Sequence, residues 1–119
     1  MISWRKHYKR GLIAIGLLLS TSASIYAQGD AKNGEKLFKA NCTACHALDK
    51  QLVGPALGGV VDRLKKEQNL DTDWLHKWIK DNKSLRESGD KYAIEVYEKF
   101  NKTEMLAYPN LTDQDINDI

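Results

Sequence analysis

The feature that most constrains this chain is the run "NCTACHAL" at residues 41–48, where Cys42 and Cys45 are followed directly by His46. These are the only two cysteines among the 119 residues. A chain of this length forms at most one domain and buries only a small apolar core. The two thiols must therefore serve one small domain, as a disulfide, a redox pair, a metal site or the attachment point of a cofactor.

Two of these alternatives need partners that the sequence does not supply. A thioredoxin-like redox pair requires a strand before the motif and a surrounding sheet, and neither is indicated. A zinc site requires further ligands at metal-binding spacing, but there is no third cysteine, and His76 lies thirty residues away on a helix face predicted to be exposed.

Covalent haem attachment requires only what the motif contains. On a helical turn, positions i, i+3 and i+4 share one face, so both thiols can reach the two vinyl groups of one porphyrin while His46 reaches the iron. We therefore predict one haem c, bound covalently through Cys42 and Cys45, with an isolated disulfide as the alternative.

The first 27 residues have the pattern of a signal peptide. Four basic residues within positions 5–10 precede "GLIAIGLLL", an apolar run of nine residues, and small and polar residues follow. Nine residues are too few for a bilayer, which takes roughly 20. We predict a signal peptide at residues 1–27, cleaved after Ala27, with cleavage after Ala23 and an uncleaved anchor as alternatives. Residues 28–119 then form a domain on the periplasmic or extracytoplasmic face of a bacterial membrane, the location that haem attachment also requires.

The net charge of +2 originates in that N-terminal segment. Without residues 1–27 the chain has 14 basic and 16 acidic residues, for a net charge of −2. A basic balance confined to a targeting segment gives no support for nucleic-acid binding. We expect no nucleic-acid partner, and any membrane association would use the N-terminal segment or a larger complex.

Apolar spacing in the remaining chain predicts an all-α fold, because no segment alternates with a period of two. Asp30, Asp71 and Thr112 are candidate N-caps, and Asp115 stands in capping-box position after Thr112. Helices are predicted at about residues 31–43, within 71–82 and 88–100, and from 112 onward, with loops at 49–60 and 101–110.

A sixth ligand for the iron can be chosen from the second loop. Met1 lies in the signal peptide, whereas Met105 lies 59 residues after His46, where a side chain can be aimed without helical constraint. A core-filling role is the ordinary alternative for a methionine, and His76 is the rival ligand. We predict that His46 and Met105 hold the iron.

Two filled axial positions favour one-electron exchange over catalysis. The sequence therefore predicts an electron-transfer protein and no enzyme. A haem protein with an open sixth position that reacts with gases or peroxide is the alternative.

In combination, "NGEKLFKANCTACH", "VGPALGGV" and "MLAYP" make residues 29–119 resemble the class I c-type cytochromes. The resemblance implies a small cytochrome c fold wrapped around one covalently bound haem. It also implies that the Pro55 carbonyl holds the proximal histidine and that the first and last helices cross at Gly34 and Phe38. Redox proteins of a respiratory chain are the implied partners. The aromatic residues expected to line the haem, with core packing as the equal alternative, are Trp74, Trp78 and Tyr108.

The end of the chain departs from this pattern, because the last helix of the family runs three or more turns and this sequence stops at Ile119. We expect a truncated C-terminal helix and a chain that is a fragment of a longer protein. From "DTDWLHKWIK" onward, the sequence is similar to the leading mono-haem section of the multi-haem cytochrome subunit of alternative complex III, a bacterial membrane quinol oxidoreductase. One haem relay in such a complex is thus the alternative to an independent carrier.

Overall fold

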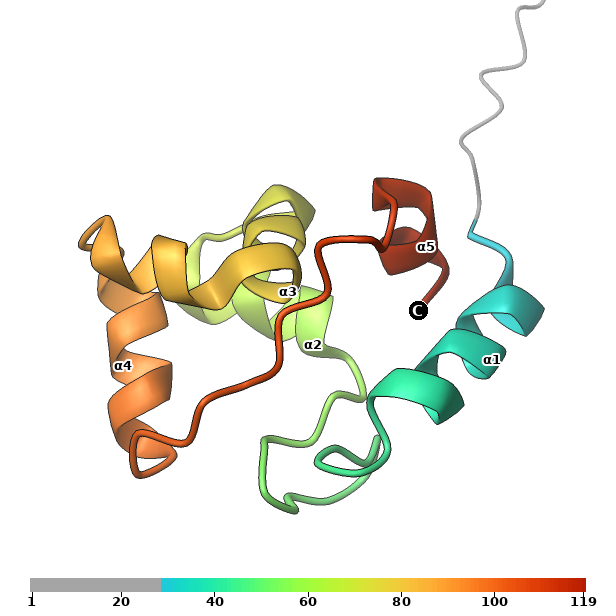
Figure 1. The fold of residues 1–119 in the computed structure, drawn as a ribbon, viewed down its shortest axis with the longest axis horizontal. Helices are drawn as coiled ribbons and strands as arrows, with labels where there is room; N and C mark the ends of the chain where they lie inside the picture. Colours follow the sequence, from blue (N-terminus) through green and yellow to red (C-terminus); the bar gives the residue numbers. More distant parts are fainter. Residues whose placement is uncertain (1–28) are drawn as a thin grey trace, which may run out of the picture.

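The computed structural model describes residues 29–119, so the predicted signal peptide and its cleavage sites lie outside the described residues. Helices and loops make up this part of the chain and no strand occurs in it, which confirms the all-α prediction (Figure 1). None of its helices is long and apolar enough to cross a membrane. The elements are α1 (Ala31–Asn41), α2 (Val60–Arg63), the π-helical turn η1 (Leu64–Gln68), α3 (Thr72–Glu87), α4 (Lys91–Lys99) and α5 (Asp113–Asp118).

The first and last helices lie side by side, and α3 contacts both α4 and α5 (Figure 1). Two long loops connect these parts: one follows α1 and leads to α2, and the other leads from α4 to α5. The predicted loop at 101–110 falls within the second connection, and the one at 49–60 falls within the first except for Val60, which begins α2. The site described below lies between the two loops.

Gly34 allows α1 and α5 to cross closely. It is buried, and a Cβ atom added to it would lie 1.7 Å from the backbone oxygen of Asp118. Two hydrogen bonds to the Asp118 carboxylate stabilise the crossing, from the backbone N–H of Asp30 (2.8 Å) and from Nδ2 of Asn33 (2.7 Å). The predicted crossing at Gly34 is confirmed, and Phe38, one turn further along α1, is half-buried.

The predicted N-caps are present. The Asp30 carboxylate accepts hydrogen bonds from the first turn of α1, and Asp71 accepts one from the backbone N–H of Trp74. Thr112 and Asp115 form the predicted capping box, and α5 has six residues. These side chains satisfy backbone N–H groups that have no partner within the helix.

Helix ends differ from the predictions where the backbone turns. α1 ends at Asn41 and not at Thr43, because the chain forms a separate turn in which the N–H groups of Cys45 and His46 both donate to the Cys42 carbonyl (3.1 and 2.9 Å). α3 continues to Glu87, well past the predicted segment, and contains extended backbone at Asp81.

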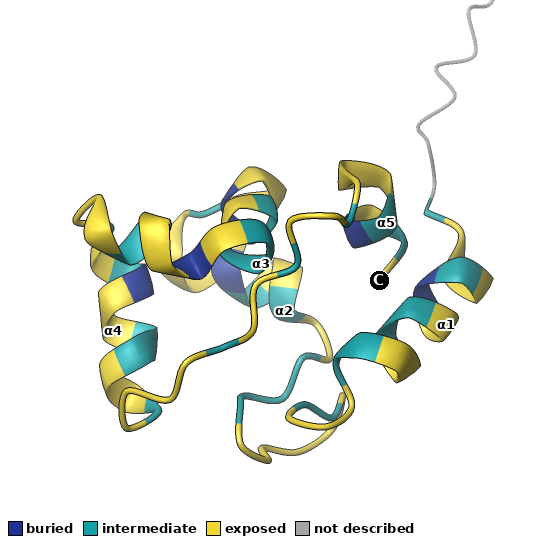
Figure 2. Ribbon diagram, in the orientation of Figure 1, coloured by how far each residue is buried: buried dark blue, intermediate teal, exposed yellow. Residues whose placement is uncertain are grey.

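The helical segment formed by α2 and η1 was not predicted. Its buried residue is Leu64, which packs in a small core with Trp74 and Ala93. Figure 2 shows that the buried positions lie on the helices. Val60, one turn before Leu64, packs against the same core. Ile116 of α5 is also buried, and most other apolar side chains of the described residues are partly buried.

The expectation that His76 lies on a solvated helix face is wrong. Its side chain is 15% exposed, and its Nε2 lies 2.9 Å from Oδ1 of Asn117 in α5. Its Nδ1 lies 3.7 Å from Asp113. α5 covers part of the face of α3 that the periodicity assigns to solvent: His76 and Lys80 contact it, whereas Lys77 is exposed.

Candidate functional site

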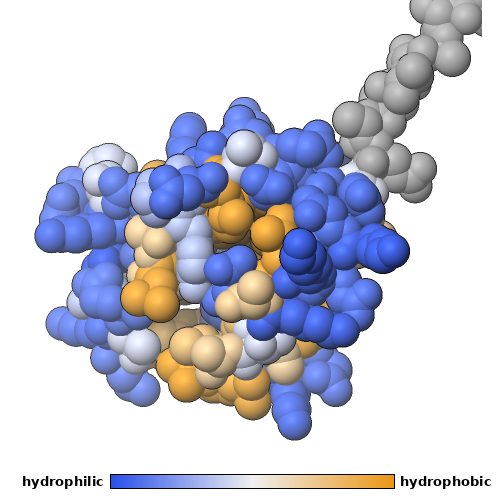
Figure 3. Space-filling model, turned by 45° about the vertical axis from the view of Figure 1, so that its right-hand side comes forward, coloured by the Kyte–Doolittle hydropathy of each residue, from blue (hydrophilic) through white to orange (hydrophobic). Residues whose placement is uncertain are grey.

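A cavity of about 460 Å³ lies between the two long loops and is walled mainly by apolar side chains. Figure 3 shows hydrophobic side chains gathered around a hollow on one face of the molecule, with hydrophilic side chains around it. All eight residues predicted for the site line this cavity: Cys42, Cys45, His46, Pro55, Trp74, Trp78, Met105 and Tyr108. His76 does not line it.

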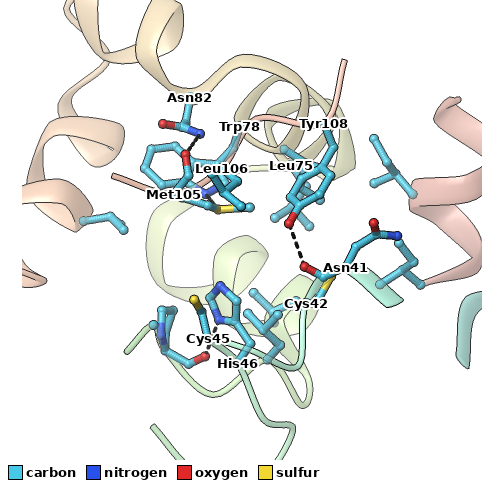
Figure 4. Close-up of a pocket in the computed structure, with 18 of the residues that line it drawn as sticks. Asn41, Cys42, Cys45, His46, Leu75, Trp78, Asn82, Met105, Leu106 and Tyr108 are labelled. Carbon is cyan, nitrogen blue, oxygen red and sulfur yellow. Dashed lines mark hydrogen bonds between the residues drawn. The ribbon is translucent and has the colours of Figure 1, made fainter. Parts of the chain in front are cut away.

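The C-x-x-C-H motif forms one side of the cavity. Cys42 and Cys45 are both free thiols; Cys42 is half-buried and Cys45 is exposed. Burial raises the pKa of the Cys42 thiol. The tight turn that follows α1 places both sulfur atoms and the His46 ring at this side (Figure 4).

His46 is oriented by the loop that follows the motif. Its Nδ1 lies 2.9 Å from the Pro55 carbonyl oxygen and donates to it, because a carbonyl can only accept. That bond leaves Nε2 as the nitrogen with a free lone pair. The ring packs closely against Gly54, where a Cβ atom would lie 2.3 Å from Cε1 of His46.

Arg63 holds the Pro55 loop in place and was not singled out from the sequence. Its guanidinium donates to the backbone carbonyls of Ala56 (2.6 Å) and Gly58. An arginine satisfies two carbonyls well because its donors form a rigid fork. The only sequence signal was the position of Arg63 just after the glycine-rich loop. Because the helical segment at 60–68 was not predicted, nothing indicated that the Arg63 side chain points back toward that loop.

Met105 lies on the opposite side of the cavity from His46 (Figure 4). Its Sδ accepts a hydrogen bond from Nε1 of Trp78 at 3.1 Å, and its backbone oxygen accepts one from Nδ2 of Asn82 at 3.0 Å. Asn82 is 2% exposed and was not among the predicted site residues. A polar residue at the end of an amphipathic segment resembles any solvated position, so the sequence carried no signal for its role.

Three predicted aromatic residues close the cavity on the side of α3. Trp74 and Trp78 stack with ring centroids 5.4 Å apart, and Trp74 both lines the cavity and belongs to the core. The Tyr108 hydroxyl donates to the Asn41 carbonyl at 2.6 Å (Figure 4). Burial raises the pKa of Tyr108, and the nearby Cys42 and Cys45 raise it further.

The donor set and the walls of this cavity fit haem c. Two thiols are present for thioether bonds, and an imidazole nitrogen and a thioether sulfur on opposite sides match the axial ligands of a low-spin iron. The apolar walls suit the porphyrin faces.

The model of the cytochrome c family matches residues 31–119. The chain belongs to the cytochrome c family. The C-x-x-C-H motif of this cytochrome is therefore the attachment site of covalent haem c. The family consists of haem proteins that transfer electrons, in agreement with the expectation of an electron-transfer protein rather than an enzyme.

Several relatives share shorter stretches with this cytochrome. It is 54% identical over 44 residues to cytochrome c2 of Rhodopseudomonas palustris, covering 37% of this chain and 31% of that protein. It is 56% identical over 36 residues to the c-type cytochrome cy of Rhodobacter capsulatus, covering 29% and 18%. With cytochrome c of Arabidopsis thaliana the identity is 46% over 44 residues, covering 34% and 39%.

The alignments with the cytochrome c2 relatives span about a third of the length of those proteins. The comparison with solved structures gave no match.

Proposed function

We propose that this cytochrome carries single electrons through one haem whose iron His46 and Met105 would hold, on the extracytoplasmic side of a bacterial membrane. The observation that carries the proposal is the placement of a free imidazole nitrogen and a thioether on opposite sides of one apolar cavity, with the two cysteines beside the imidazole. Haem c, when bound, supplies a one-electron couple between ferric and ferrous iron.

The surrounding residues prepare both ligands for this role. The Pro55 carbonyl accepts a hydrogen bond from Nδ1 of His46. This bond fixes the tautomer and makes the lone pair of Nε2 more basic. The thioether of Met105 is a soft, neutral ligand that favours the reduced state and raises the reduction potential. The apolar walls act in the same direction, because a low-dielectric site disfavours the additional positive charge of the oxidised state.

The cellular setting is part of the same proposal. Residues 1–27 act as a signal peptide and residues 28–119 as the electron-carrying domain in the periplasm. The exchange partners are redox proteins of a respiratory chain, a class that fits a small carrier with a single haem. The name of the cytochrome c2 relatives supports this class of carrier.

Expression of the full chain with a haem-attachment system tests the function. We expect one haem that stays bound after denaturation, a low-spin spectrum, and reversible titration in a single one-electron step. The native ferrous protein should bind carbon monoxide poorly, because Met105 occupies the sixth position. Ready binding of carbon monoxide by the native protein would favour a gas- or peroxide-reactive haem instead.

The alternative, one haem relay within a larger quinol oxidoreductase, can be tested on the sequence of the complete gene. Further C-x-x-C-H motifs encoded downstream of Ile119 would place this haem at the start of a multi-haem chain, as in alternative complex III. Their absence in the complete gene would leave the independent carrier.

A further inference from the structure

Three N–H donors on α3, spaced four residues apart, bind the segment that carries Met105. Trp78 donates to the Met105 sulfur at 3.1 Å, and Asn82 donates to the Met105 carbonyl at 3.0 Å. Arg86 donates to the Glu104 carboxylate at 2.5 Å. These donors come from both sides of the bend at Asp81, and together α3 presents a row of three donors to this loop.

The loop depends on these side chains because it has little support of its own. Within the described residues, positions 104–107 make no hydrogen bond to another backbone group; the nearest such bonds are those of Thr103 to Phe100 and of Tyr108 to Ile79. Leu106, next to Met105, is 73% exposed. Neither backbone pairing nor burial of its neighbour therefore fixes the Met105 backbone.

Asn82 is the one member of the row that acts on the Met105 backbone itself. Its side chain is 2% exposed, and a buried amide is costly unless its polar groups are paired. The Met105 carbonyl supplies that pairing (Figure 4). The hydrogen bond therefore has two effects. It restrains the Met105 backbone, and it satisfies the buried amide of Asn82.

The bend of α3 brings Asn82 into the cavity wall. At Asp81 the backbone is extended (φ −159°, ψ 76°), and the helix begins again under a new cap. The Asp81 carboxylate accepts from the backbone N–H of Ser84 at 3.0 Å and from its hydroxyl at 2.6 Å, as an N-cap residue does. In a helix without this bend, residue 82 would lie in a different position relative to the cavity.

We propose that Asn82 is a positioning residue that holds Met105 in place as the sixth ligand of the iron. The proposal rests on the function proposed above, in which Met105 is that ligand. Trp78 restrains the sulfur and Asn82 restrains the backbone from which the side chain extends. Loss of the Asn82 donor increases the fraction of molecules in which Met105 has left the iron.

Imidazole binding to the ferric, haem-loaded full chain measures that fraction. Imidazole takes the sixth position only where Met105 has left, so its apparent affinity scales with the open population. Asn82→Leu keeps a similar volume and removes the donor. Losing one hydrogen bond of ordinary net strength should raise the imidazole affinity by about twofold to tenfold. The red absorption band of Met-to-iron ligation should weaken in parallel.

Leu85→Ala is the matched control on the same helix. Leu85 packs against the core but does not line the cavity, so this variant lowers overall stability without touching Met105. We expect its imidazole affinity to stay within about twofold of the native value while its melting temperature falls. If Asn82→Leu does not yield folded holoprotein, the smaller Asn82→Ala replaces it.

The outcomes separate the two proposals. An unchanged imidazole affinity in a folded Asn82 variant overturns the role of Asn82, and so does an equal rise in Leu85→Ala. Met105→Ala is measured alongside, and it should bind imidazole more tightly than any other variant. If Met105→Ala binds imidazole no better than the native protein, the ligand assignment itself fails, whatever the Asn82 variants do.

Discussion

His46 and Pro55 are joined by a hydrogen bond of 2.9 Å that decides which imidazole nitrogen faces the cavity. Because the Pro55 carbonyl takes the Nδ1 proton, the ring presents Nε2 to the side where Met105 lies. Gly54, just before Pro55, permits this arrangement because the His46 ring occupies the space that a side chain at position 54 would fill. The backbone of this loop thus orients the residue that, in the proposed function, would hold the iron.

Gly54→Ala should displace His46. The added Cβ would lie 2.3 Å from the ring, which must move or tilt, and overpacking of this kind costs about 1–3 kcal/mol. We expect a lower melting temperature and an altered haem spectrum in the purified holoprotein. Gly89→Ala is the control, because Gly89 has a positive φ of 86° but no neighbour within 4 Å. It should lose stability and keep the native spectrum; a native spectrum in both variants would contradict the role of Gly54.

Met105→Ala should leave the haem covalently attached and open its sixth position. Carbon monoxide should then bind the ferrous protein readily, whereas it binds the native protein poorly. His76→Ala serves as the comparison, since His76 pairs with Asn117 and lies outside the cavity wall. It should lower the melting temperature slightly and leave the spectrum unchanged. If His76→Ala loses the low-spin spectrum and Met105→Ala keeps the native one, His76 and not Met105 is the sixth ligand.

Gly34→Ala should disrupt the crossing of α1 and α5. The new Cβ would meet the Asp118 backbone at 1.7 Å, so the helices must separate. We expect a loss of about 1–3 kcal/mol in the free energy of unfolding, measured by denaturant titration. Lys36→Ala, at an exposed position of the same helix, should change that free energy by less than about 0.5 kcal/mol. Equal effects of the two substitutions would mean that α5 does not pack closely on Gly34.

Acid should weaken the same crossing through Asp118. Hydrogen bonds from Asn33, the Asp30 backbone and Gln114 lower the pKa of Asp118 below its ordinary value. A carboxyl group with a lowered folded pKa contributes stability above its unfolded pKa, about 3.9, and loses that contribution as the pH falls through the folded value. Native protein and Asp118→Asn should therefore differ most at neutral pH and converge below about pH 4. Thermal melts across this range provide the measurement, and a gap that does not depend on pH would contradict the coupling.

Tyr108→Phe should loosen the tie between the Met105 loop and the end of α1. It removes the hydroxyl that donates to the Asn41 carbonyl at 2.6 Å and keeps the ring in the cavity wall. We expect a stability loss of about 1 kcal/mol in chemical denaturation. Attached haem and its low-spin spectrum should persist. A larger loss accompanied by a changed spectrum would indicate that Tyr108 acts directly on the haem environment.

The sequence alone was sufficient for features that depend on neighbouring residues. Cys42, Cys45 and His46 lie within five consecutive positions, so their common face follows from the geometry of one turn. The N-caps were predictable for the same reason, because a capping side chain bonds to backbone three residues away or fewer. The short helical segment at 60–68 escaped prediction, since its apolar residues are few and only Leu64 is buried.

The tertiary structure decided the contacts between distant positions that no sequence motif marked. His76 was expected in solvent from the periodicity of its own helix, and it is covered because α5 returns to α3 from the other end of the chain. Asn82 could not be distinguished from a solvated residue until the Met105 loop lay against it. The physical reason is that helical periodicity reports which residues share a face, while burial and hydrogen-bond partners depend on what that face meets after the chain has folded.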